Sequence, residues 1–215
     1  MANVRPKRTH SVMKKADLQA NHEPLDDAIE RYREFMERMI NAQRVIRSDQ
    51  ERRDLAESVL LRLCASWEKF VDEHLVDCLN RDASKFGEFL GVTIPAHPNR
   101  DLCEGLLFGG GYRDFKDIGN LIGFTKKVLP ETSNPFPALT TTNRKRIDEV
   151  YAIRNYLSHY SKRSRRGLMA MYTKEYGLER FREPGHFLLA NKAKRLWAYF
   201  EAFEGASRDL YGFWE

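Results

Sequence analysis

With 215 residues, the chain is long enough to bury one substantial hydrophobic core, and the usual size of domains favours one domain over two. Hydrophobic residues make up 42% and charged residues 31%, a balance that excludes a disordered chain and is typical of a globular protein with charged helix faces. The net charge of +5 is modest, but residues 144–166 alone contribute +6, from eight basic and two acidic side chains.

The N-terminal residues are polar and basic. They contain no apolar core of the kind that a signal peptide requires, and no later apolar run approaches membrane-spanning length. We therefore expect a cytoplasmic protein without a membrane segment. Residues 1–24 also lack periodicity and end at Pro24, so we interpret them as a flexible basic arm that precedes a single helical domain at residues 25–215.

Apolar residues then recur at helical spacing in two long segments. The first extends from Leu25 to Ile46 and the second from Asp49 to Asp82, with a capping break at Ser48. Because the turn between them is short, we expect the two helices to form an antiparallel pair.

Residues 83–140 are less regular. Pro95, Pro98 and the glycines at 109–111 interrupt short helical pieces, which predicts additional short helices and loops packed on the side or end of the bundle. No Lys-Ser/Thr pair follows the glycines, so a flexible turn is a better interpretation than a phosphate-binding loop.

The last third returns to helical periodicity. A helix is predicted to begin near Thr141, where Thr141, Thr142 and Asn143 are reasonable N-cap candidates, in the segment that extends to Ser161. After a turn at Pro184-Gly185, apolar residues on one face of 191–214 predict a closing helix. Since every long periodic segment is helical, the sequence predicts an all-α fold.

The helix that contains Arg154-Asn155-Tyr156-Leu157-Ser158-His159 has two distinct faces. With Arg154 set to zero on a helical wheel, Ser158 falls near 40°, Asn155 near 100° and His159 near 140°. The opposite side, at roughly 200° to 320°, carries an apolar stripe that we expect to pack into the core. The stripe consists of Val150, Ile153, Tyr156, Leu157 and Tyr160.

A permanent cation beside an imidazole suits cleavage of RNA through its own 2′-hydroxyl. Histidine transfers protons near neutral pH, and arginine offers a fork of donors to phosphate oxygens. One helix supplies too few groups, so we expect two copies of this face to meet across a two-fold axis. Ser158 is a candidate for a hydrogen bond to the substrate, whereas Glu68 of the preceding helix is more simply a solvated residue. The candidates for binding flanking phosphates are Lys162, Arg163, Arg165 and Arg166.

Two stretches of this chain resemble the HEPN ribonucleases. The segment RNYLSH is similar to their R-x4-6-H motif, including the polar residue, here Asn155, after the arginine. The segment LCASWEKFVDEHLVDCL is similar to the second long helix of the RiboL-PSP-HEPN-like group. The resemblance covers residues 50–200 in broad organisation and these two stretches at residue level.

The resemblance implies a HEPN-like up-and-down helical bundle, to which the short helices and loops between residues 83 and 140 are an addition. It implies a metal-independent endoribonuclease in which Arg154 and His159 are catalytic and Asn155 orients one of them. It also implies a homodimer with both motifs at the interface, a role in toxin–antitoxin or phage-defence systems, and an antitoxin or nucleotidyltransferase-like partner. The histidines and cysteines show no spacing typical of a transition-metal site, so we expect no metal and no cofactor.

A second interpretation stays open. The chain could be a non-catalytic HEPN module that binds RNA, a nucleotide or a protein partner, with the polar face of the helix as a dimer contact. Arg154 and His159 would then be structural hydrogen-bonding residues.

Overall fold

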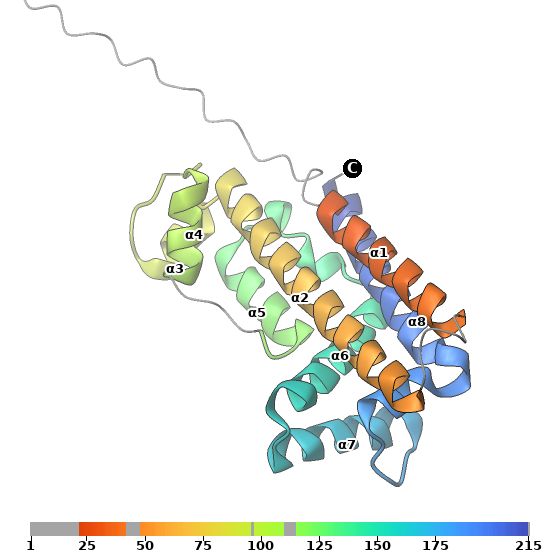
Figure 1. The fold of residues 1–215 in the computed structure, drawn as a ribbon. Helices are drawn as coiled ribbons and strands as arrows, with labels where there is room; N and C mark the ends of the chain where they lie inside the picture. Colours follow the sequence, from red (N-terminus) through yellow and green to blue (C-terminus); the bar gives the residue numbers. More distant parts are fainter. Residues whose placement is uncertain (1–21, 42–47, 96, 110–114, 215) are drawn as a thin grey trace, which may run out of the picture.

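The computed structural model describes residues 22–41, 48–95, 97–109 and 115–214 (Figure 1). Within these ranges all regular structure is helical and no strand occurs, which confirms the predicted all-α bundle. No helix in these ranges is both long enough and apolar enough to cross a lipid bilayer. Most of the predicted basic arm, residues 1–21, lies outside the described residues.

The first two helices form the predicted antiparallel pair. Helix α1 comprises His22–Asn41 and α2 comprises Asp49–Arg81, and the two pack side by side in opposite directions (Figure 1). Helix α1 begins earlier than predicted, at His22, and Pro24 lies in its first turn. Proline is tolerated there because the N–H groups of the first turn have no acceptor within the helix. Ser48 caps α2 as expected: its Oγ accepts the Glu51 N–H at 3.2 Å, and the Glu51 carboxylate accepts the Ser48 N–H at 3.0 Å.

Helix α2 is the central element of the core. It contacts α1, α4, α6 and α8, where α6 comprises Thr141–His159 and α8 comprises Pro184–Tyr211. Trp67 of α2 is fully buried, and its ring packs against Phe203 of α8 with 5.5 Å between the ring centroids. The four helices α1, α2, α6 and α8 pack together (Figure 1), and their buried apolar side chains belong to one continuous cluster.

The region between α2 and α6 contains the short elements that the sequence predicts. They are α3 (Ser84–Leu90), α4 (Arg100–Phe108), α5 (Ile118–Val128) and the 3-10 turns η1 (Glu131–Ser133) and η2 (Phe136–Ala138). Helix α4 packs on α2 and is anchored by an ion pair from Arg100 to the buried Asp77. Helix α5 contacts α6, so this added region reaches the helix that carries the candidate site.

Helix α7 (Lys162–Tyr176) follows α6 directly, and the short turn η3 (Gly212–Trp214) ends the described chain. The expected turn at Pro184-Gly185 is instead the start of α8, since proline suits the first position of a helix. A Cβ on Gly185 would lie 2.5 Å from the Cβ of Arg53, so glycine allows α8 to approach α2 closely. The backbone of α8 then breaks at residues 190–193, of which 191–193 are left-handed, before the closing helix continues.

Candidate functional site

The local sequence determines how α6 presents its polar face. Thr140 caps the helix, its Oγ1 accepting the Asn143 N–H at 3.4 Å, one residue before the predicted cap. The apolar stripe is buried at Val150, Ile153, Tyr156 and Leu157, as predicted. These side chains turn the opposite face of α6, which carries Arg154 and His159, away from the core.

The prediction for Tyr160 is wrong. Its side chain is 66% exposed, and its backbone is left-handed with φ 44° and ψ 29°. Such a conformation costs a bulky residue on the order of 1 kcal/mol. The left-handed backbone of Tyr160 terminates α6, whose last residue is His159. Ser161 then caps α7, its Oγ accepting the Ser164 N–H at 3.0 Å. His159 therefore lies at the corner between two helices, where its ring is exposed.

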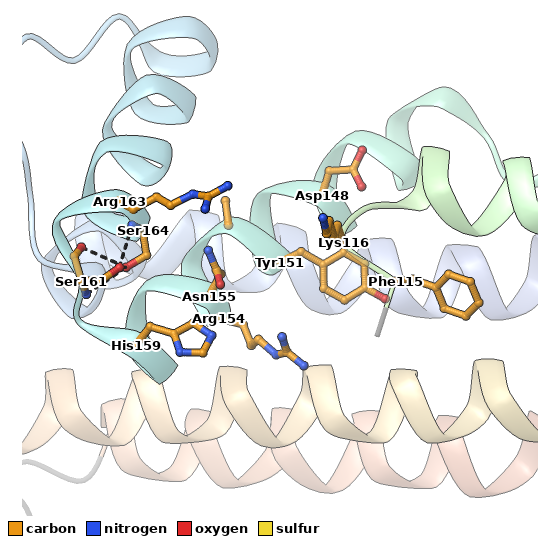
Figure 2. Close-up of a pocket in the computed structure, with 11 residues that line it drawn as sticks. Phe115, Lys116, Asp148, Tyr151, Arg154, Asn155, His159, Ser161, Arg163 and Ser164 are labelled. Atoms are coloured by element: carbon orange, nitrogen blue, oxygen red, sulfur yellow. Dashed lines mark hydrogen bonds between the residues drawn. The ribbon is translucent and has the colours of Figure 1, made fainter. Parts of the chain in front are cut away.

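A pocket of about 490 Å³ lies beside this corner. Side chains from α6, from the start of α7 and from the segment before α5 line it together (Figure 2). The lining residues are Phe115, Lys116, Asp148, Tyr151, Ala152, Arg154, Asn155, His159, Ser161, Arg163 and Ser164. The predicted pair Arg154 and His159 thus shares one cavity with Asn155 and Arg163.

Two consecutive residues of α2 hold the α6 face in place. The indole Nε1–H of Trp67 donates to the hydroxyl of Tyr151 at 3.1 Å, and Glu68 forms an ion pair with Arg154, with 2.9 Å between Oε1 and Nη2. The Glu68 and Arg154 side chains are 17% and 23% exposed. The expectation of a solvated Glu68 is therefore wrong. In Figure 2 the Arg154 side chain extends from α6 toward α2, with the His159 ring beside it.

The pocket has a positive balance of charge. Lys116, Arg154 and Arg163 face one carboxylate, Asp148, which gives the lining a formal charge of +2 with the histidine neutral. Asp148 also has a structural task, because its Oδ1 accepts the Ile118 N–H at the start of α5 at 2.7 Å. Burial raises the pKa of this carboxyl, and the Ile118 N–H lowers it by a smaller amount. A cavity of this composition favours an anionic ligand.

The basic residues after α6 separate into different environments. Arg163 lines the pocket, while Lys162 and Arg166 are exposed outside it. The Arg165 guanidinium lies 4.1 Å from the centroid of the Phe181 ring, where a cation–π contact holds it. Ser158 is exposed and is not among the lining residues. Of the predicted residues, four meet in the pocket: Arg154, Asn155, His159 and Arg163.

The basic residues at the start of α6 stabilise the fold instead of lining this pocket. Arg144 donates to the backbone carbonyls of Pro137 and Leu139. Lys145 forms an ion pair with Glu175, and Arg146 one with Glu149. Only part of the positive charge of residues 144–166 is therefore available to a ligand at the pocket.

Lys116 is the lining cation that sequence reasoning missed. It precedes α5 and is 38 residues from Arg154 in the chain, so no local spacing relates the two. The Asp148 bond to Ile118 and the packing of α5 on α6 bring it to the pocket. Only the tertiary fold makes Lys116 part of the candidate site.

Comparison with known proteins finds no family model, no curated protein and no solved structure that matches this chain. Among the residues that the structure describes, no group of three or more His, Cys, Asp or Glu side chains is arranged to hold a metal ion. The chemistry of the side chains in the pocket is therefore the best indication of function.

Proposed function

We propose that this chain is a metal-independent endoribonuclease of the HEPN type that cleaves RNA by attack of the 2′-hydroxyl on the adjacent phosphate. The observation that supports it most directly is the pocket in which Arg154 and His159 lie with Asn155, Arg163 and Lys116. An imidazole and three cations in one cavity match the needs of this reaction, which moves protons at oxygen and builds negative charge on phosphorus.

Each lining residue has a role in this proposal. His159, exposed at the end of α6, takes the proton from the 2′-hydroxyl or gives one to the leaving 5′-oxygen. Arg154 donates to the non-bridging oxygens of the scissile phosphate and stabilises the charge of the transition state. Asn155 orients one of these two groups. Arg163 and Lys116 bind flanking phosphates.

The reaction needs both an acid and a base, and His159 is the pocket's one histidine among the described lining residues. We propose that a second copy of the chain supplies the other, in a homodimer with the two Arg154–His159 pairs at the interface. The exposure of His159 and of the neighbouring Tyr160 leaves this corner available for such contact. By the resemblance, the cleavage serves a toxin or phage-defence role in the cytoplasm, with an antitoxin or nucleotidyltransferase-like partner.

One observation favours the non-catalytic alternative. Arg154 forms an ion pair with Glu68, as a structural arginine would. In a module that only binds RNA, a nucleotide or a protein, this pair would stabilise the bundle and His159 would take part in no proton transfer. The two functions differ in their products, because internal transesterification leaves a 2′,3′-cyclic phosphate and binding leaves the RNA intact.

The test is cleavage of an end-labelled RNA in the presence of a chelator, with the new ends identified. The wild type should produce 2′,3′-cyclic phosphates, and His159→Ala should lose at least about 100-fold of this activity, since general acid–base catalysis contributes about 10² or more. His186→Ala, which removes an exposed histidine outside this pocket, should retain it. Equal cleavage by His159→Ala and the wild type, or none by any of the three proteins, would contradict the proposal.

A further inference from the structure

We propose that Glu68 is a positioning residue that holds the Arg154 guanidinium ready for the scissile phosphate and, by its negative charge, weakens the binding of RNA in the ground state. The catalytic part of this inference rests on the proposed function. Its structural basis is the 2.9 Å contact between Arg154 Nη2 and Glu68 Oε1.

Two neighbouring residues of α2 help to place Glu68: Trp67, and Cys64, whose thiol donates to Glu68 Oε1 at 3.8 Å. Trp67 is fully buried in the core, and its Nε1–H donates to the Tyr151 hydroxyl at 3.1 Å. Tyr151 and Arg154 are three residues apart on α6, so they lie on neighbouring turns of one face. Trp67 and Glu68, which are adjacent on α2, thus contact Tyr151 and Arg154 of α6. The Trp67–Tyr151 hydrogen bond fixes how α2 and α6 are aligned along their axes, and so brings the Glu68 carboxylate level with Arg154.

The pair is better placed than an exposed ion pair to restrain its arginine. Both side chains are mostly buried, at 17% and 23% exposure, so solvent and salt screen their attraction less than at the surface. A free arginine side chain samples many rotamers, and the ion pair limits them before the substrate binds. Donors that are already oriented need no rearrangement in the transition state, which is how preorganisation accelerates a reaction.

A carboxylate can hold this arginine without excluding phosphate. A guanidinium has five N–H donors arranged as a fork, so one ion pair does not by itself exclude a phosphate oxygen, and the atoms closest to each other in this pair are Glu68 Oε1 and Arg154 Nη2. The same carboxylate nevertheless repels an approaching phosphodiester. Glu68 should therefore increase the rate of the bound complex while it decreases the affinity for RNA, and these opposite effects distinguish positioning from a purely structural role.

The variants Glu68→Gln and Glu68→Ala separate the two effects. We expect kcat to fall about tenfold in Glu68→Ala, and less in Glu68→Gln, whose amide oxygen keeps a partial negative charge beside the Arg154 guanidinium. Because both variants remove one negative charge near the phosphate, we expect either to bind an uncleavable 2′-O-methyl RNA about threefold more tightly. The matched control is Glu73→Gln, which removes the same charge from the same helix where Glu73 faces Lys69, and it should change neither value.

Unchanged kcat and Kd in both Glu68 variants would overturn the inference. A parallel loss of kcat and RNA affinity would also overturn it, because that result indicates damage to the fold. A double-mutant cycle of Glu68→Ala and Arg154→Ala, followed by urea unfolding without RNA, provides a readout that needs no activity. We expect a coupling of about fivefold in the unfolding equilibrium constant.

The cycle also separates this inference from the proposed function. If the wild type does not cleave RNA, the catalytic role of Glu68 is wrong. The coupling still shows whether Glu68 restrains Arg154, and RNA binding by the Glu68 variants still shows whether its charge repels phosphate. If the wild type cleaves and the coupling is absent, the proposed function stands and the inference about Glu68 is wrong.

Discussion

Two arginines of α7 provide a test of the proposed RNA path, because they are alike in sequence and differ in environment. Arg163 lines the pocket with His159, whereas the Arg165 guanidinium lies 4.1 Å from the Phe181 ring centroid. We predict that Arg163→Ala weakens RNA binding and that Arg165→Ala does not.

The magnitude follows from counterion release. Each phosphate contact with a single strand contributes about 0.7 to the slope of log K against log salt concentration. At 0.1 M salt, a slope of about 0.7 per contact means that removing one phosphate contact weakens binding about fivefold, or by about 1 kcal/mol. Loss of the Arg165 cation–π contact should instead lower the free energy of unfolding by about 0.5 to 1 kcal/mol.

The assay is fluorescence anisotropy with a labelled, uncleavable 2′-O-methyl RNA at several salt concentrations, together with urea unfolding of each variant. Arg163→Ala should reduce the salt slope by about 0.7, and Arg165→Ala should leave it unchanged. Equal reductions in both variants would refute the reasoning, because they would mean that α7 attracts RNA through its overall charge and not through the residue in the pocket.

Two further predictions concern the buried carboxylates. Glu149→Ala should lower the free energy of unfolding by about 3 kcal/mol or more. The reason is that Glu149 is 2% exposed and accepts hydrogen bonds from the Tyr176 and Tyr199 hydroxyls. A change below about 1 kcal/mol on urea unfolding would contradict this prediction. Burial raises the pKa of Asp77 to about 6, and the attraction of Arg100 opposes this shift only in part. The folded protein then binds this proton more tightly than the unfolded chain, so ionisation of Asp77 costs stability above pH 6, and this cost disappears as the pH falls through 6 to 4. The stability of Asp77→Asn relative to the wild type should therefore be about 2 kcal/mol more favourable at pH 7 than at pH 4. A difference that is the same at both pH values would contradict this prediction.

The sequence was sufficient for properties that depend on local backbone geometry. The helical period identifies the buried face of α1 at Leu25 and Ile29 and that of α6 at Val150 and Ile153, and it places Arg154 and His159 on the polar face that lines the pocket. The capping pattern at Ser48 correctly locates the start of α2. These features follow from residues within a few positions of each other, whose relative placement the helix itself determines.

Tertiary packing decided which side chains share the pocket and which neutralise one another. Lys116 reaches the pocket through α5, Glu68 meets Arg154 because Trp67 is anchored in the core, and Arg165 is held by Phe181. Nor does helical periodicity show that α6 ends at His159, with Tyr160 left-handed at the corner before α7. Some of these arrangements depend on contacts between residues far apart in the chain, and others on the path of the chain between helices. The packing of the complete bundle determines the contacts and the path alike.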